Sequence, residues 1–485
     1  NSTGENYGLL DAGGVSNTAM FIRSMDSYGG GNNFHDCNPG RVTTPYIGWF
    51  AKVYNIPELA AGRKNQITSG GYSASLEDAL WYIQDKSVTE NNLPLDVHIG
   101  GLDTVSIRSS YTDNDGLYFS SHGGPVFCYH SQADAGTFVF DMQGVRWASD
   151  IGLENYNTQR DGSSAGYYTA YRRRAEAHNV MVFNPDQSGG MDDNASAVMT
   201  AWQSKPRGAF AAYDLSDVYN KYVSDYTRGY YVGNDRRSLT IRDEFTVKED
   251  MPAYWFMTTP ADVEIIDNKT AILKKANKKM KLEILTEADI AEFTAGEAAP
   301  LPTSPILEGQ TVNTGYTRLA LKINAQRDKA QTITVRISPY GEISEPVSDI
   351  PVSEWTLPDG EYKIRESMNA RIMVNGRDIN NVATDGKVGI VEGEPLPEIT
   401  AAAENPAHHV EIIPGEPADA YTVVRVYNAD RSQYNDFYVE YSKSKSADLS
   451  DFEKLDITDI NVSSTPEEAN VKENMVDNDY STRWT

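Results

Sequence analysis

The chain of 485 residues carries 43 basic and 69 acidic side chains, which gives a formal net charge of −26. A chain of this length exceeds what one hydrophobic core fills, so we expect several domains. The negative field repels nucleic acids and anionic membrane surfaces, and we expect neither as a partner. It also repels anionic sugars, so a site for one has to be locally basic. No run of about 18 apolar residues is present, so we expect no membrane insertion.

The first 93 residues are predicted to be helical and rich in turns. Apolar residues recur at helical spacing after Pro45, and Ser75 with Asp78 has the pattern of a capping box. A polar loop that contains His35 lies between the first helical stretches. So few helices cannot bury a core of their own, so we expect residues 1–93 to be the C-terminal part of a larger helical domain.

From Leu93 the pattern changes to short alternating apolar runs, as at 105–107 and 117–119, separated by Gly, Asn and Asp. Such runs are typical of antiparallel strands joined by hairpins. We therefore predict a mainly β fold, with a large antiparallel β-sandwich over residues 94–345. A cluster of prolines then precedes a smaller β-sandwich, which we place at 346–445.

The chain has two cysteines, Cys37 and Cys128, and neither lies in a spacing typical of metal ligands. One pair is too few for a disulfide-rich scaffold. Two interpretations stay open at this point: two buried thiols, or one bridge between the N-terminal segment and the central domain.

Several side chains that titrate, coordinate or hydrogen-bond gather in the block 126–183. They are His130, Gln132, Asp134, Asp150 and His178. Because they fall on or beside consecutive predicted strands, they can converge on one edge of a sheet. Two histidines and an aspartate are suitable metal ligands, although each residue by itself can equally be a satisfied structural group.

The same block resembles the signature of the C-terminal domain of heparinase II/III-type polysaccharide lyases. Three ordered pieces carry the resemblance: His130-Ser-Gln-Ala-Asp-Ala-Gly-Thr-Phe138, Gly144-Val-Arg-Trp-Ala-Ser-Asp-Ile-Gly152 and Ala177-His-Asn179. The resemblance covers residues 94–345 and, more weakly, the helical stretch before them. It implies that residues 1–93 are the end of an α/α toroid.

The resemblance implies an enzyme that cleaves uronic-acid-containing, glycosaminoglycan-like polysaccharides by β-elimination. In this reaction the uronate carboxylate is neutralised, a base removes the C5 proton, and an acid protonates the leaving oxygen. The match places His130 at the histidine that lines the site. Tyr156 is the candidate catalytic tyrosine, with packing on the sheet as the alternative. A non-catalytic glycan-binding or scaffold protein is the alternative function.

The resemblance also implies a structural zinc ion with Asp150 and His178 among its ligands. Gln132 stands where the family has a further histidine, and glutamine is a poor zinc ligand. Gln132 is therefore either a hydrogen-bonding residue that holds the loop without metal or a contact to substrate.

Two further residues are candidates for substrate binding. Arg174 belongs to the strongest basic cluster of the chain and either meets a sulfate or carboxylate or pairs with Glu176. His35 either lines the cleft or caps its loop.

Residues 446–485 are predicted to be a linker and the truncated start of a discoidin-like module, which their sequence resembles. In the family, a catalytic tyrosine and an Asn or His that neutralises the carboxylate come from the toroid. We find no match to either in residues 1–93, so we expect an incomplete piece of the enzyme. The resemblance further implies a secreted or cell-surface bacterial protein.

Overall fold

The computed structural model describes residues 6–40, 44–69, 72–82, 87–128, 130–158, 169–185, 190–286, 293–342, 350–379, 387–391, 395–414 and 421–444. The predicted discoidin-like module lies outside these residues. The chain divides into two compact units, one of residues 1–388 with 397–440 and one of 389–396 with 441–485. The boundary predicted after residue 345 does not coincide with this division.

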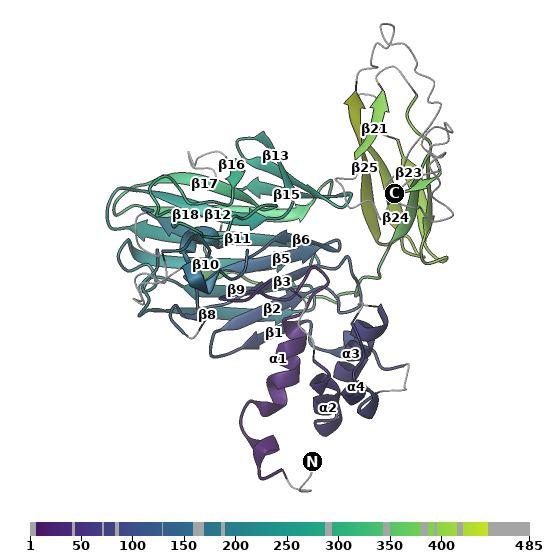
Figure 1. Ribbon diagram of the computed structural model, residues 1–485, viewed down its shortest axis with the longest axis horizontal. Helices are drawn as coiled ribbons and strands as arrows, with labels where there is room; N and C mark the ends of the chain where they lie inside the picture. The colour runs from purple at the N-terminus through teal and green to yellow at the C-terminus, as the bar shows by residue number, and fades with distance from the viewer. Residues whose placement is uncertain are drawn as a thin grey trace, which may run out of the picture. The chain divides into compact units, whose positions relative to one another are not determined.

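The N-terminal segment is helical, as predicted. Its α-helices are α1 (Thr18–Ser24), α2 (Tyr46–Val53), α3 (Pro57–Ser69) and α4 (Leu76–Leu80), and its 3-10 turns are η1 (Leu9–Asp11), η2 (Val15–Asn17) and η3 (Glu90–Asn92). The capping box predicted at Ser75 and Asp78 begins α4. Figure 1 shows α2, α3 and α4 grouped together. A small core that includes Ile47, Ala51 and Leu59 joins α2 and α3.

Three antiparallel sheets form the large sandwich. The first, in the order β1-β2-β3-β5-β6, contains β1 (Asp96–Ile99), β2 (Thr104–Arg108), β3 (Tyr118–Ser121), β5 (Phe138–Met142) and β6 (Val145–Ala148). The second, in the order β13-β14-β15-β18-β11-β10-β9-β8-β4, contains β4 (Gly124–Pro125), β8 (Ser196–Lys205), β9 (Gly208–Asp214), β10 (Val223–Gly233), β11 (Ser238–Val247), β13 (Asp262–Asp267), β14 (Thr270–Lys275), β15 (Lys278–Ile284) and β18 (Ala330–Pro339). The third, in the order β16-β17-β12-β7, contains β7 (Met181–Phe183), β12 (Met251–Thr259), β16 (Phe293–Glu297) and β17 (Thr317–Ala325).

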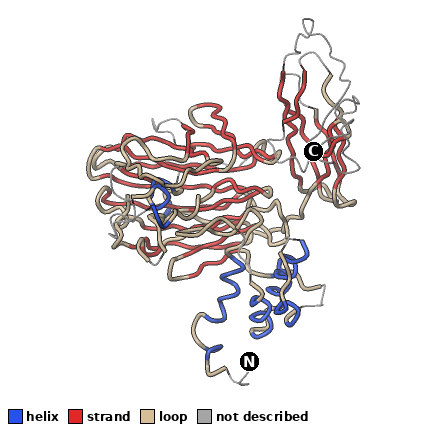
Figure 2. Tube along the Cα trace, in the orientation of Figure 1, coloured by secondary structure: helices blue, strands red, loops and turns tan. Residues whose placement is uncertain are grey.

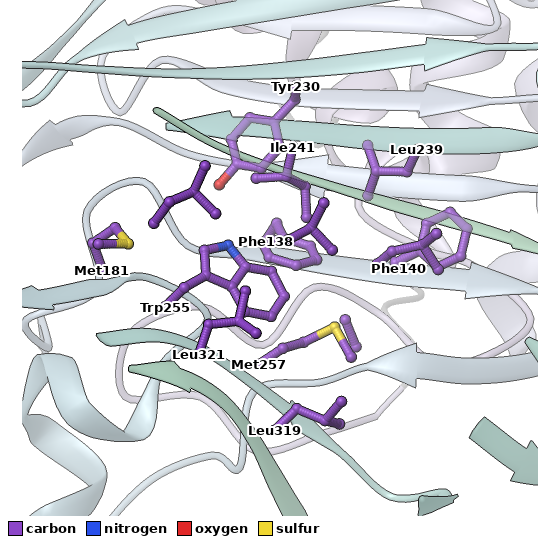
Figure 3. Close-up of a cluster of buried hydrophobic side chains, with 14 of the residues drawn as sticks. Phe138, Phe140, Met181, Tyr230, Leu239, Ile241, Trp255, Met257, Leu319 and Leu321 are labelled. Carbon is purple, nitrogen blue, oxygen red and sulfur yellow. The ribbon is translucent and has the colours of Figure 1, made fainter. Parts of the chain in front are cut away.

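One hydrophobic core joins the three sheets. Phe138 of β5 lies in Figure 3 between Ile241 of the second sheet and Trp255 of the third, and all three side chains are fully buried. Each large apolar side chain removed from water in this way contributes roughly 1.5–3 kcal/mol to stability. The core therefore fixes the first sheet, which carries the family-like motif, against both of the others.

A second group of strands follows the large sandwich (Figure 2). One sheet, in the order β20-β19-β22, contains β19 (Ala370–Val374), β20 (Arg377–Asp378) and β22 (Ile399–Ala403). The other, in the order β21-β25-β24-β23, contains β21 (Lys387–Val391), β23 (His409–Ile413), β24 (Tyr421–Tyr427) and β25 (Tyr434–Ser444). Within the smaller β-sandwich predicted at 346–445, residues 361–369 form no strand.

The mainly β fold class is confirmed, whereas the assignment of the helices to a toroid stays a prediction. Cys37 is an exposed free thiol and Cys128 a half-buried one. The disulfide bridge between Cys37 and Cys128 is thus not formed. The alternative of two buried thiols is wrong as well, because Cys37 is exposed. Among the described helices, none is both long and apolar enough to cross a membrane.

Candidate functional site

The polar loop around His35 docks on the loop that carries the first motif. The backbone amide of Asp36 donates to the carbonyl of His130 at 2.9 Å. The amide of His35 donates to Oδ2 of Asp134 at 2.7 Å. Gln132, with its amide oriented by the surrounding acceptors, donates to the carbonyls of His35 at 3.1 Å and Arg172 at 3.0 Å. Two segments about a hundred positions apart are thereby fixed to one another.

An exposed pair of side chains lies at this junction. Nδ1 of His130 is 2.9 Å from the phenol oxygen of Tyr156, and the phenol hydroxyl donates to Oδ2 of Asp36. The His130 side chain is 74% exposed and that of Asp36 is fully covered. The two catalytic residues predicted from the sequence are therefore brought together, on a carboxylate that the sequence did not single out.

One arginine, Arg173, lies beside this pair. Burial raises the pKa of Asp36, and the charge of Arg173 with the hydrogen bond from His130 works against that shift. The guanidinium of Arg173 also lies 5.6 Å from the centroid of the Tyr156 ring. Arg173 is 1% exposed, so its charge acts on the pair from below the surface and is offset by the carboxylate of Asp36.

A buried cluster of five polar residues lies next to the exposed pair. Its members are His35, His122, Asp134, Asp150 and His178, and Asp134 belongs to two groups of three whose ligand atoms lie within 4.8 Å of one another. Burial would raise the pKa of Asp134, but the charges of His35 and His122 hold it well below its ordinary value. The cluster thus contains an ionised carboxylate surrounded by histidines.

The two residues expected to hold zinc pair with each other. Nδ1 of His178 is 2.6 Å from Oδ2 of Asp150, and both side chains are fully buried. Burial would lower the pKa of His178, but the charge of Asp150 outweighs it and the pKa is raised. Because Gln132 is engaged with backbone carbonyls, Asp134 is the third donor near this pair. The residues at the zinc positions of the family therefore fit a zinc ion poorly. Zinc bound by Asp150 and His178 stays a prediction.

Other motif residues hold the site in place. Asn179 donates to the carbonyl of Phe138 at 2.7 Å and accepts from the amide of Thr258 at 2.7 Å. Arg228, buried against Asp243, donates to the carbonyl of Asn179 at 2.8 Å and to that of Gly136 at 3.1 Å. These bonds satisfy backbone groups that would otherwise be buried without partners.

The Gly-Val-Arg-Trp motif anchors the N-terminal segment. Arg146 pairs with Asp141 and donates to the carbonyls of Gly30 at 2.8 Å and Gly31 at 3.3 Å. Asn33 donates to the carbonyl of Asp150 at 3.0 Å. The motif therefore positions the loop that carries His35 and Asp36.

The residues predicted to bind substrate are covered. Arg174 is 2% exposed and its guanidinium lies 3.5 Å from Glu176, which is the structural alternative raised from the sequence. Gln132 is fully buried, and the His35 side chain is 14% exposed. A covered side chain cannot contact a polysaccharide without movement of the loop, so this placement argues against direct substrate contacts.

Sequence reasoning missed three residues of the site: Asp36, His122 and Arg228. Asp36 could have been found from its place beside His35 in a polar loop. His122 offered no signal except the scarcity of histidine, which occurs 7 times. Arg228 lies in a tyrosine-rich strand, and nothing in the sequence distinguishes it from an exposed arginine. The structure shows that it is fully buried, and a buried arginine requires a partner.

A wide hollow of about 750 Å³ lies elsewhere on the sandwich, between β13 and β16. Its lining includes Asp262, Glu264 and Glu297, against one basic residue, Lys274, which pairs with Glu264. Acidic walls repel a polyanion, so its size does not make it the better candidate for an acidic glycan.

Comparison with known proteins identifies proteins with a similar fold. Residues 115–340 match the family model described as Heparinase II/III-like, C-terminal. The heparan sulfate lyase HepC from Pedobacter heparinus has a similar structure, with a TM-score of 0.50, 12% identity, and coverage of 88% of this chain and 53% of that one. A crystal structure of heparinase III gives a TM-score of 0.50, 10% identity, and coverage of 90% and 56%. No curated protein matches by sequence.

These similarities define a chain with the C-terminal β-sandwich fold of heparinase III, and residues 115–340 match the model of the heparinase II/III-like C-terminal domain. The chain spans about half the length of the solved structures it resembles. At this level of identity the similarity shows the fold alone.

Proposed function

We propose that the chain is part of a polysaccharide lyase that cleaves uronic-acid-containing, glycosaminoglycan-like chains by β-elimination. The observation that carries this proposal is the exposed His130, hydrogen-bonded to Tyr156 above the covered carboxylate of Asp36, on a heparinase-like sandwich.

The hydrogen bonds of the pair specify where the protons lie. Tyr156 donates its hydroxyl proton to Asp36, so its oxygen is an acceptor toward His130. Nδ1 of neutral His130 then carries the proton, and Nε2 carries a lone pair. With a side chain that is 74% exposed, Nε2 is available to a sugar at the surface.

This arrangement suits proton transfer in β-elimination. Nε2 of His130 removes the C5 proton of the uronate, the C4–O bond breaks, and a C4=C5 double bond forms. The imidazolium that results is stabilised by Asp36 through the Tyr156 hydroxyl and returns its proton to the leaving glycosidic oxygen. Neutralisation of the uronate carboxylate falls to a group other than these three side chains.

A polymeric, charged substrate does not cross membranes, so the enzyme has to meet it outside the cytoplasm. The proposal therefore includes secretion or attachment at the cell surface of a bacterium.

The test is the ultraviolet absorbance of the unsaturated uronate product with heparan sulfate, chondroitin sulfate, hyaluronan and alginate. We expect the absorbance to rise on one of these substrates. In the variant His130→Ala we expect the rate of this rise to be lower by about 100-fold or more, on the order of the usual contribution of acid–base catalysis. His409→Ala removes another exposed histidine, on β23, and is the matched control. Equal rates for His130→Ala and wild type would remove His130 from the mechanism.

Affinity electrophoresis on the same four glycans tests the alternative function, a glycan-binding protein without activity. Retardation by one glycan with no product formed by the folded chain would favour binding alone and count against the lyase proposal.

A further inference from the structure

A set of three residues in the buried cluster has no role in the proposed proton transfer: His35, His122 and Asp134. Oδ1 of Asp134 lies 3.0 Å from Nδ1 of His35 and 3.5 Å from Nε2 of His122. Despite these distances, none of these three atoms has a hydrogen bond of acceptable geometry to any described residue. Buried polar atoms that face one another without bonding call for an explanation.

The tautomer of His122 indicates what is missing between them. Its Nδ1 lies 2.9 Å from the carbonyl of Gly123, and a carbonyl only accepts, so Nδ1 carries the proton. Nε2 of the neutral ring then carries a lone pair that faces the carboxylate of Asp134, and both side chains are 1% exposed. Two electron-rich atoms in contact with each other, away from water, are stabilised by a cation between them, which is either a proton or a metal ion. An imidazole whose other nitrogen donates to a backbone carbonyl is the usual state of a metal ligand.

His35 is brought to the same point by a constrained backbone. Its φ of 59° lies in the left-handed region, which residues other than glycine rarely adopt. Its amide is held by Asp134 and its carbonyl by Gln132, and its ring centroid is 4.5 Å from that of His122. A non-glycine residue held in this conformation by several contacts is typical of functional sites.

We propose that His35, His122 and Asp134 bind a divalent transition-metal ion of the zinc type. Two imidazoles and one carboxylate form a donor set that zinc and its neighbours favour. The ion ties the N-terminal loop to the sandwich, and the residue after His35 is Asp36, which contacts Tyr156. The metal is thus a clamp that positions the exposed pair.

This site differs from the one that the family resemblance implies. Asp150 and His178 satisfy each other at 2.6 Å, and Gln132 is bound to backbone carbonyls, so the unsatisfied ligand atoms are found at the other set. Asp134 belongs to both sets, so a substitution of Asp134 cannot distinguish the two sites. His122 and His35 belong to the proposed site alone, and His178 belongs to the other.

The experiment measures metal content of the whole 485-residue chain by mass spectrometry after dialysis against zinc or cobalt and removal of unbound ion. Wild type is compared with His122→Gln, His35→Asn and His178→Gln. His408→Gln, which changes a buried histidine far along the chain, is the matched control. Visible absorption of the cobalt form reports nitrogen ligation independently of any activity.

We expect about one bound ion per chain in wild type, His408→Gln and His178→Gln, and loss of this ion and its cobalt bands in His122→Gln and His35→Asn. Absence of metal from wild type, retention of the ion by His122→Gln or His35→Asn, or its loss from His178→Gln alone would each overturn the proposal. Circular dichroism checks the folding of each variant. If His122→Gln fails to fold, His35→Asn decides, because His35 belongs to a loop outside the sheets.

Discussion

The phenol oxygen of Tyr156 lies 2.9 Å from Nδ1 of His130, although the two residues are 26 positions apart. Both side chains are largely exposed, so no core packing accounts for the contact. It exists because Asp36, from a third segment, accepts the phenol hydroxyl and is itself held by the backbone of His130. The exposed pair therefore depends on the docking of the N-terminal loop.

Tyr156→Phe tests this dependence with the smallest possible change. The variant keeps the ring near Arg173 but removes the oxygen that links His130 to Asp36. We expect product formation to fall by about 100-fold, mainly in kcat, with the fold unchanged. Tyr46→Phe, at another exposed tyrosine, is the control and should have no effect. Full activity in Tyr156→Phe would mean that the tyrosine packs on the surface without a chemical role.

Gly152→Ala tests whether the second motif positions the N-terminal loop. Gly152 has a φ of +84°, and an added Cβ would lie 2.9 Å from Cδ of Pro39 and 3.3 Å from the carbonyl oxygen of Cys37. We expect a loss of stability of about 1–2 kcal/mol from the backbone conformation, together with lower lyase activity as Asp36 is displaced. The measurements are thermal melting and the ultraviolet assay.

The control for this change is Gly296→Ala on β16, where a Cβ meets nothing within 4 Å. It should melt and react like wild type. Equal behaviour of the two variants would show that the contact of Gly152 with the loop does not position Asp36.

Arg228→Met tests the buried ion pair behind the motif. Arg228 and Asp243 are both fully buried, with Nε 2.6 Å from Oδ1. Removing one partner leaves a buried charge uncompensated, and we expect a loss of about 3–5 kcal/mol in the free energy of unfolding. Urea unfolding followed by tryptophan fluorescence measures it. Arg327→Met breaks an exposed pair with Asp328 and should change little. Similar small losses in both variants would contradict this prediction.

Asp113→Asn tests a pH dependence of stability. Burial, with the nearby charge of Asp115, raises the pKa of Asp113 to about 7, while Arg365 and Arg237 oppose the shift. The folded state therefore holds a proton that the unfolded state has released, so stability is fully present below about pH 4 and is lost as pH rises to 7. The loss amounts to at most roughly 4 kcal/mol.

We expect Asp113→Asn, which cannot ionise, to show a flatter dependence of melting temperature between pH 4 and 8 and to be the more stable protein at pH 8. Asp217→Asn makes the same charge change at an exposed position and should retain the wild-type dependence. A variant Asp113→Asn with the wild-type slope would show that other groups cause it.

Local patterns predicted those parts of the molecule that follow from local physics. The alternation at 105–107 and 117–119 predicted β2 and β3, because successive side chains of a strand point to opposite faces. Both faces of these two strands are buried, and their polar residues lie on the face away from the large core. The capping pattern at Ser75 predicted the start of α4, because its partners lie within one helical turn. Strands β8 and β13 have largely exposed faces and weak apolar alternation, so local patterns indicate them only weakly.

The sequence by itself determined the mainly β fold, the motif and the candidates His130 and Tyr156, since each is encoded in a short stretch of chain. Only the tertiary structure decided that Asp36 underlies this pair, that Arg174 pairs with Glu176, and that His122 rather than Gln132 faces Asp134. These contacts join segments whose proximity depends on strand order and loop docking. Strand order and loop docking leave no periodic signal in the residues that make these contacts, because the packed core as a whole determines which segments meet.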